Sequence, residues 1–431
     1  MKLNYKRTFF VGLAFLSICA FWQMYDNIIP LMLKNTFGLG ETVTGIIMAL
    51  DNVLALFLLP ALGALSDKVD TPIGKRTPFI IGGTLVAVIA VIFIPIANNQ
   101  KSLGMFIFFL GVVLFAMGTY RSPAVALMPD LTPKPLRSKA NAVINLMGAV
   151  GGVYTLIMIK LLVNKESSDY LPVFLSVAAL MVIAIILLVI TINEKKIAEE
   201  IKASETFDQE AVEDKSEQMT DQQQVYEMSG KVRKSLIFLL ASIFFWFTAY
   251  NAVTTAFSRY VEVVWKLKPG GFTDALLVAT VAAIASYIPI GHIASRIGRK
   301  KTILAGILLM TGSYLCGAFF TSYSFFINII FAFTGIGWAA INVNSLPMVV
   351  EMCKNSDIGK FTGIYYTTSM SAQIITPILS GALLESISYR TLFPYAAVFS
   401  IASFCTMLLV KHGDSKPMKR ANAIENFDVE D

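Results

Sequence analysis

Long apolar runs separated by short polar segments form the pattern of hydrophobic and polar positions along this chain. A helix that crosses a bilayer needs roughly 20 predominantly apolar residues. Runs of that length occur twelve times, and their expected ranges are 8–33, 42–65, 78–98, 103–128, 140–163, 171–192, 235–261, 274–294, 302–321, 325–350, 361–384 and 390–410. Because every backbone polar group in a bilayer must find a partner within its own segment, these runs are predicted to be helices. The pattern therefore indicates an all-α membrane protein with twelve transmembrane helices.

A polar stretch at 193–234 interrupts the pattern between the sixth and seventh runs. It holds 11 acidic and 7 basic residues, which is typical of a surface helix or a disordered linker. We therefore expect two six-helix bundles, at 1–192 and 235–411, joined by a cytoplasmic linker. Residues 412–431 are expected to form a cytoplasmic tail.

Composition and charge placement support this picture. Hydrophobic residues make up 55% of the chain, charged residues 15%, and the mean hydropathy is +0.66, whereas soluble domains are about 25% charged. With the N-terminus inside, 26 of the 35 Lys and Arg residues fall in cytoplasmic segments and 7 in outer ones. Since positive residues favour the cytoplasmic side, we predict a plasma-membrane protein with both termini in the cytoplasm. The net charge is +6, but the basic residues fall in short loops between the apolar runs. This distribution does not indicate a nucleic-acid partner.

Few residues could bind a metal or catalyse a reaction. The four cysteines lie far apart, and the two histidines, His292 and His412, fall at predicted cytoplasmic helix ends. Neither a disulfide framework nor a metal site is expected from this spacing. The chain also has no phosphate-binding loop motif, so ATP-driven chemistry has no support. We predict that the protein is not an enzyme and uses no cofactor beyond a proton or a monovalent cation.

Matching segments indicate that the two halves are repeats. The loops after the second and eighth runs share glycines followed by basic residues: Gly63, Asp67, Gly74, Lys75 and Arg76 in the first, and Gly291, Arg296, Gly298 and Arg299 in the second. Asp130, after the fourth run, lies 221 residues before Glu351, which follows the tenth. Parallel repeats of this kind build many two-bundle transporters. We predict that the acids and bases of these loops pair across a cytoplasmic gate.

The segment 66–80, Ser-Asp-Lys-Val-Asp-Thr-Pro-Ile-Gly-Lys-Arg-Thr-Pro-Phe-Ile, resembles the loop signature of the major facilitator superfamily. Its length, with Pro60 upstream and Pro123 and Asp130-Leu-Thr-Pro downstream, is similar to one branch of that family. This branch contains the sucrose:proton symporters and the bacterial glycoside–pentoside–hexuronide:cation symporters. The resemblance implies two pseudo-symmetric six-helix bundles that move a small solute, expected to be a sugar, across a lipid bilayer. We expect the chain to work as a monomer.

The chain departs from this branch at the positions that bind the ion and the sugar. The paired aspartates of the bacterial symporters fall on Ala55 and Leu59, and the helix 4 aspartate of the plant carriers falls on Leu114. Tyr250 and Asn251 stand in the region of the acidic residue on helix 7. The residues that bind the ion and the sugar in this branch of the family are therefore absent from these positions.

Three ionisable residues lie deep within the predicted spans: Asp26, Asp51 and Arg121. A charge at the centre of a bilayer helix costs at least about 2.5–3.5 kcal/mol. Asp26 and Asp51 fall at similar depth on consecutive helices, and two close carboxylates cannot both ionise easily. We predict that Asp26, with Asp51, carries the coupling proton or binds substrate hydroxyls; the alternative is that Asp26 only fixes helix packing. Arg121 could bind an acidic sugar or another anion, or donate hydrogen bonds to sugar hydroxyls; the alternative is a gate residue that pairs with a helix terminus or with Asp130.

Aromatic and amide side chains complete the candidate substrate site. Amides bind sugar hydroxyls, and aromatic rings stack on the apolar face of a sugar; the alternative for each residue is packing. The candidates are Trp22, Asn27, Tyr120, Trp246, Tyr250, Asn251, Trp338, Asn342, Asn344 and Gln373.

The leading interpretation is a secondary active symporter that imports a sugar or glycoside with protons by rocking two bundles about a central site. A proton-coupled efflux antiporter for hydrophobic or cationic compounds, with Asp26 as the acceptor, is the alternative. A membrane scaffold or sensor would need no charges inside its spans, contrary to the sequence.

Overall fold

The computed structural model describes residues 3–133, 136–163, 169–201, 230–352 and 358–414. Within these ranges the long helices are α1 (Tyr5–Asn35), α2 (Glu41–Lys68), α3 (Thr77–Asn99), α4 (Leu103–Asp130), α5 (Arg137–Leu162), α6 (Leu171–Thr191), α8 (Gly230–Val263), α9 (Thr273–Ile297), α10 (Arg299–Phe319), α11 (Phe326–Val350), α12 (Ile358–Ser386) and α13 (Leu392–Leu408). A short 3-10 helix, η3 (Tyr389–Thr391), precedes α13. The chain is all-α as predicted. Most of the predicted linker and tail lies outside the described residues.

Each of the twelve predicted ranges coincides with one of these helices. In the described part of the chain, eleven helices are long and apolar enough to cross a membrane. The helix outside this set is α12, whose 29 residues include several serines and threonines. A multi-pass membrane protein is confirmed, and the role of α12 as a twelfth span stays a prediction.

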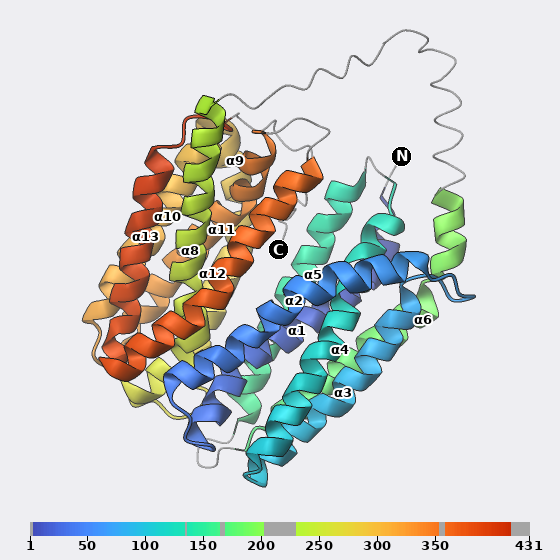
Figure 1. Cartoon of the computed structure of the whole chain (residues 1–431), viewed down its shortest axis with the longest axis horizontal. Coiled ribbons are helices and arrows are strands. Elements are labelled where there is room, and N and C mark those ends of the chain that lie inside the picture. Colours follow the sequence, from blue (N-terminus) through green and yellow to red (C-terminus); the bar gives the residue numbers. More distant parts are fainter. Residues whose placement is uncertain (1–2, 134–135, 164–168, 202–229, 353–357, 415–431) are drawn as a thin grey trace.

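The helices pack mainly within two groups that follow the order of the sequence (Figure 1). In the N-terminal group α1 packs on α5 and α6, and α3 on α4 and α6; in the C-terminal group α8 packs on α13, and α11 on α9 and α10. The groups meet where α2 packs on α12, α5 on α9 and α1 on α8. We call the end where α1 begins and α13 ends the termini face, and the opposite end the far face.

Glycines allow the closest helix contacts. A Cβ added to Gly151 on α5 would lie 2.1 Å from the carbonyl oxygen of Leu16, and one on Gly335 would lie 2.0 Å from that of Ala279. Any larger side chain there would separate the helices. This agrees with the general use of small residues where membrane helices approach each other.

Candidate functional site

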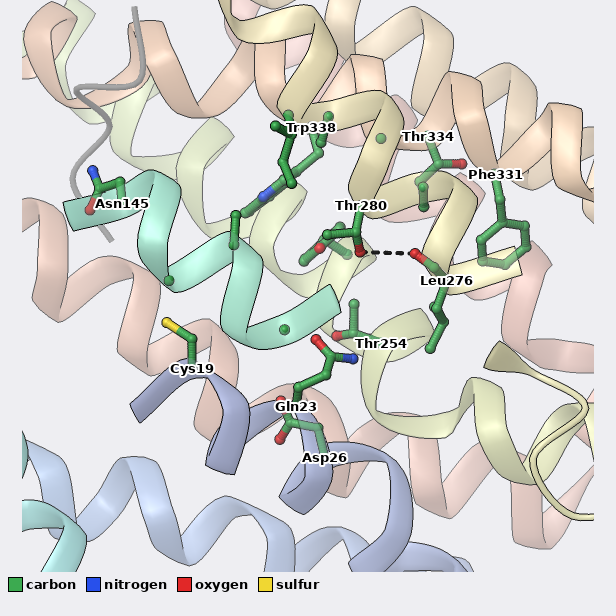
Figure 2. Close-up of a pocket in the computed structure, with 18 of the residues that line it drawn as sticks. Cys19, Gln23, Asp26, Asn145, Thr254, Leu276, Thr280, Phe331, Thr334 and Trp338 are labelled. Atoms are coloured by element: carbon green, nitrogen blue, oxygen red, sulfur yellow. Dashed lines mark hydrogen bonds between the residues drawn. The ribbon is translucent and has the colours of Figure 1, made fainter. Parts of the chain in front are cut away.

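A cavity of about 340 Å³ lies between the two helix groups, bounded by α1, α5, α8, α9 and α11. Figure 2 shows Gln23 and Asp26 on one side of it, with Thr254, Thr280 and Trp338 from the C-terminal group around them. The polar or aromatic residues that line this first cavity are Gln23, Asp26, Asn27, Asn145, Tyr250, Asn251, Thr254, Thr280, Tyr287, Phe331, Thr334 and Trp338. Both halves of the chain therefore contribute hydrogen-bonding groups to one space.

Two amides in the first cavity have buried atoms without a hydrogen bond. Asn27 donates its Nδ2 to the carbonyl oxygen of Gln23 at 2.9 Å, and its Oδ1 has no hydrogen-bond partner among the described residues. The Nδ2 of Asn251, on the opposite helix group, also has none. An unpaired buried polar atom is costly, and the described residues leave one such acceptor on α1 and one such donor on α8. Tyr250 and Trp338 also line this cavity, and their rings stack on each other with centroids 3.8 Å apart.

A second cavity, of about 700 Å³, lies between α2, α4, α8, α11 and α12. Its polar or aromatic lining residues are Asn52, Arg121, Ser122, Phe247, Trp338, Asn342, Tyr365, Tyr366, Thr367, Ser369 and Gln373. Trp338 lines both cavities. Ala55 and Leu59, which replace the paired aspartates of the related symporters, also line the second cavity. That wall is therefore apolar.

Asp26 and Arg121 lie at different depths. Asp26 is nine residues from the far-face end of α1, and Arg121 is nine residues from the termini-face end of α4. At 1.5 Å per residue each is roughly 13 Å inside its own end. The two side chains form no ion pair with each other in the described part of the chain.

Arg121 is also not the partner of Asp130, which was the structural alternative. The Oδ2 of Asp130 accepts a hydrogen bond from the Nε of Arg76 at 2.8 Å. The guanidinium of Arg121 lies 6.0 Å from the ring centroid of Trp22, within reach of a cation–π interaction. Trp22 itself is not among the residues that line either cavity.

Asp51 has a different environment from Asp26. Its Oδ1 accepts hydrogen bonds from the backbone nitrogen and the Nδ2 of Asn52, at 2.6 and 2.8 Å. It lies within electrostatic reach of both Asp26 and Arg121. Asp51 is not among the residues that line the two cavities, whereas Asp26 lines the first.

Three other predicted substrate residues belong to the packed interior. Tyr120 contacts the hydroxyl of Ser17 and donates to the carbonyl oxygen of Ala14 at 2.8 Å. Trp246 is buried in the core. The Nδ2 of Asn344 donates to the carbonyl oxygen of Ala340, in the same helix. None of the three lines either cavity. For these three residues the structure agrees with the alternative given above, a role in helix packing.

The predicted gate residues form an ion-pair network at the termini face. Arg76 contacts the carboxylate of Asp67 and the hydroxyl of Ser66, and it pairs with Asp130 at 2.8 Å. Burial alone would lower the pKa of Arg76, but its hydrogen bonds and ion pairs with Asp130 and Asp67 outweigh that effect and raise it. The network links α2, α4 and the start of α3, all within the N-terminal group.

The second half repeats this arrangement. Arg299, at the start of α10, pairs with Glu351 after α11, as Arg76 pairs with Asp130. Arg296 is exposed. Its side chain has no hydrogen bond or ion pair with another described residue. The pairing in both halves supports the repeat that the sequence indicated.

Two carboxylates outside the predicted set accept hydrogen bonds from the backbone at the ends of these loops. Glu194 accepts hydrogen bonds from the backbone nitrogens of Lys75, Arg76 and Thr77, at 2.7, 2.9 and 2.9 Å. Asp414 accepts from the backbone nitrogen of Lys300 at 2.8 Å. Each carboxylate follows the last helix of its half and caps the helix after the gate loop, where an anion is favoured. Their spacing of 220 residues, close to the repeat offset, is the signal that could have identified them.

A second polar cluster joins the halves at the far face. The Nε of Arg259 on α8 donates to the Oε2 of Glu41 on α2 at 2.7 Å, and both side chains are only 4% exposed. The hydroxyl of Tyr389 contacts the other oxygen of Glu41, and Lys34 lies 3.8 Å from it. We call Lys34, Glu41, Arg259 and Tyr389 the far-face cluster. The sequence placed these residues at helix ends but carried no signal that they meet.

Comparison with known proteins places this architecture in a family. The chain superposes on the nucleoside transporter NupG with a TM-score of 0.70, over 95% of this chain and 100% of that one, at 14% identity. It superposes on a peptide transporter of the POT family with a TM-score of 0.68, over 94% and 93% of the two chains, at 12% identity. At these identities the likeness shows a shared fold alone.

Sequence relatives include proteins of two kinds. Sucrose transport protein SUT3 from Oryza sativa subsp. indica is 26% identical over 137 residues, which is 27% of this chain and 27% of that protein. The MFS-type efflux pump LUC4 from Fusarium sp is 26% identical over 168 residues, which is 38% of this chain and 28% of that protein. These matches span about a quarter of the relatives' own length.

The match to a family extends much further along the sequence. The Major Facilitator Superfamily matches residues 11–286 and 265–427, which include both cavities and both gate loops. Since the matched regions run from the first span to beyond the last, the chain belongs to the Major Facilitator Superfamily and is a secondary transporter of that kind.

Proposed function

We propose that the protein is a symporter that imports a sugar or glycoside with protons, and that Asp26 carries the proton. The first cavity is the observation that supports this proposal most directly. Asp26 is the single carboxylate among the residues that line the two cavities. It shares the first cavity with Asn27, whose Oδ1 has no partner among the described residues, and with Asn251, whose Nδ2 has none.

The lining of the first cavity suits a polyol. A sugar carries several hydroxyls that both donate and accept, which are the groups that Asn27 Oδ1 and Asn251 Nδ2 require. The stacked rings of Tyr250 and Trp338 offer an apolar face for the C–H side of a sugar ring. Ligand sites generally combine such apolar surfaces with a few placed polar groups.

Proton coupling follows from the position of Asp26. A carboxylate between the two helix groups can exchange protons when the cavity opens to one side, and it is costly to carry across the membrane in its charged form. Protonation would neutralise the Asp26 carboxylate, and a bound substrate would satisfy the polar groups of the cavity. Both would occur before the two helix groups rock. This links the movement of the solute to that of the proton.

Efflux of hydrophobic or cationic compounds is the second candidate, because the relatives include an efflux pump. Asp26 could accept a cation in that case. Arg121 lines the neighbouring cavity, and its positive charge would repel a cationic substrate. The positive charge and the amides of the two cavities together favour a polyol.

The test is uptake into proteoliposomes that contain the purified full chain. Radiolabelled sugars are offered with and without an inward pH gradient. We expect uptake of at least one sugar to rise with the gradient, and Asp26→Asn to abolish that rise while leaving counterflow of the sugar measurable. Asp70→Asn is the matched control, since the Asp70 side chain is 71% exposed at the termini face.

Two results would contradict the proposal. Gradient-driven uptake that is unchanged in Asp26→Asn would remove this residue from coupling. Failure of every sugar, together with exchange of a lipophilic cation for protons, would establish the efflux reading instead.

A further inference from the structure

We propose that a groove between α3 and α4 at the termini face binds one acyl chain of an anionic phospholipid, whose headgroup is held by Lys68 and Lys75. The ligand is a lipid of the leaflet that adjoins the termini face. This site lies outside both cavities, and its role does not depend on the solute that the protein carries.

The groove has a volume of about 440 Å³ and lies between two helices that pack side by side in the N-terminal group (Figure 1). None of the described residues that line it is charged. Thr119 also lines it, and its hydroxyl donates to the carbonyl oxygen of Phe115 at 3.0 Å. The groove therefore presents an almost entirely apolar surface, which includes Val69, Pro78, Phe79, Val86 and Phe115.

Two glycines of α3 create this groove. A Cβ added to Gly82 would have no neighbour within 4 Å in the described part of the chain. At Gly83 a Cβ would lie 2.9 Å from the Cβ of Tyr120, so α3 and α4 are in close contact beneath the groove. A narrow space along a protein surface loses dispersion contacts unless another molecule fills it. An alkyl chain has the width and the chemistry to do so.

The groove matches one leaflet in length. Its lining residues on α3 run from Pro78 to Val86, which is roughly 12 Å at 1.5 Å per residue. Half of a bilayer core is about 15 Å. Deeper along the same helices the rings of Phe93 and Phe109 stack with centroids 4.7 Å apart. A partner helix that crosses the membrane would need a matching face along the whole span, so a groove of half that length favours an acyl chain.

The groove lies on the outer surface of the helix group. Val86 is 46% exposed and Phe115 is 56% exposed. Both α3 and α4 are long and apolar enough to cross a membrane, and the surface that such helices expose within a bilayer meets lipid hydrocarbon. The chemistry of the occupant follows from this position.

Two lysines stand at the termini-face end of the groove. Lys68 precedes the lining residue Val69, and Lys75 lies three residues before Pro78. Both are exposed, and neither side chain forms a hydrogen bond or an ion pair with another described residue. A lysine near the end of a membrane helix extends its charge toward the headgroup layer. A basic residue close to an anionic membrane surface adds about fivefold in affinity.

The acids near these lysines are engaged with other groups. Asp67 contacts Arg76, and Asp70 pairs with Lys195 at 3.7 Å. Glu194 is the helix cap described above. The two lysines are therefore available to an anion from the membrane, and the headgroup site lies on the loop that carries Arg76 of the gate.

The test is photolabelling of the purified full chain in phosphatidylcholine vesicles. Trace phosphatidylglycerol or phosphatidylcholine, each with the same diazirine-bearing acyl chain, is activated by light, and labelled residues are identified by mass spectrometry of peptides. We expect the phosphatidylglycerol probe to label residues 78–86 and 115–119 at least about tenfold more than the phosphatidylcholine probe. The surface around Phe108, which is 64% exposed and outside the groove, should be labelled equally by both.

Filling the groove tests the chain site. Gly82→Leu should lower labelling of the groove to the level seen around Phe108. Gly111→Leu is the matched control, because it adds the same side chain to an exposed glycine of α4 outside the groove, where a Cβ has no neighbour within 4 Å. Val86→Phe is a second filling variant in case Gly82→Leu does not fold. Thermal unfolding of each variant confirms that it is folded.

Removing the charges tests the headgroup site. Lys68→Gln combined with Lys75→Gln should abolish the preference for phosphatidylglycerol. The control is Lys231→Gln combined with Arg233→Gln, which removes two exposed positive charges at the start of α8, in the other helix group. This control should keep the preference.

Each remaining outcome overturns the proposal. Labelling of the groove that does not exceed labelling around Phe108, or that persists in folded filling variants, would show that no chain binds there. Equal labelling by the two probes, or a preference that survives loss of both lysines, would reject the headgroup site. Crosslinks from this surface to a second protein chain would assign the groove to a partner helix instead.

Discussion

The far-face cluster predicts a large change in conformation from a single substitution. Glu41 and Arg259 come from different helix groups, are both 4% exposed, and pair at 2.7 Å. Alternating access requires the groups to separate at this face, and separation breaks the pair. We therefore expect Arg259→Leu to favour the conformation in which the far face is open.

The structure gives the magnitude. Removing one partner of a buried ion pair costs about 3–5 kcal/mol, because the other charge is left uncompensated. We take the lower value, about 3 kcal/mol, because Lys34 stays 3.8 Å from Glu41 and compensates part of its charge. Since 1.4 kcal/mol is tenfold in an equilibrium constant, the ratio of the two conformations should change by about two powers of ten.

Double electron–electron resonance between spin labels at the far face measures this ratio. Gln100→Cys and Ser322→Cys place labels on exposed positions of the two groups, in a background without the native cysteines. We expect short distances in the unmodified background and a major population of longer ones in Arg259→Leu.

A second inter-group pair at the same face provides the control. Lys160 and Asp274 pair at 2.5 Å but are 52% and 44% exposed, and exposed pairs contribute about 0–1 kcal/mol. Lys160→Gln should therefore leave the distances almost unchanged. Equal distributions in Arg259→Leu and Lys160→Gln would show that burial of the pair does not hold the far face closed.

Three further substitutions test other contacts. Gly45→Ala would place a Cβ 2.1 Å from the carbonyl oxygen of Pro377, so it should separate α2 from α12 and lower the melting temperature. Gly111→Ala, whose Cβ would have no neighbour within 4 Å, should leave the melting temperature unchanged. Equal melting temperatures of the two variants would refute this. Glu194→Gln should cost about 1–2 kcal/mol in unfolding experiments, because an anionic helix cap is lost, and a change below the error of the measurement would contradict the capping role. Arg76→Lys keeps the charge but not the fork that spans two carboxylates, so transport should fall at least tenfold while the protein stays folded; wild-type transport would remove the network from the gate.

The helices and the repeat were predictable from the sequence because their signals are local. Each span needs about 20 apolar residues wherever it packs, so the twelve ranges coincide with the helices found. The matching Asp130 and Glu351 lie at equivalent places in each half, and each pairs with the arginine of its own gate loop.

The direction in which a side chain points could not be predicted in the same way. A helix that is apolar on all sides has no polar face to show which residues meet the interior. All four residues Tyr250, Asn342, Trp246 and Asn344 were predicted to bind substrate because of their residue type. Tyr250 and Asn342 line cavities, whereas Trp246 and Asn344 pack in the core.

Asp26, Asp51 and Arg121 illustrate the division between sequence and structure. The sequence identified them because a charge in a membrane span is costly and must have a reason. Only the tertiary structure separates Asp26 in the first cavity from Arg121 in the second, and gives Asp51 its hydrogen bonds to Asn52. The physical reason is that burial and pairing depend on contacts between helices distant in sequence, as they do for Glu41 and Arg259, which are 218 residues apart.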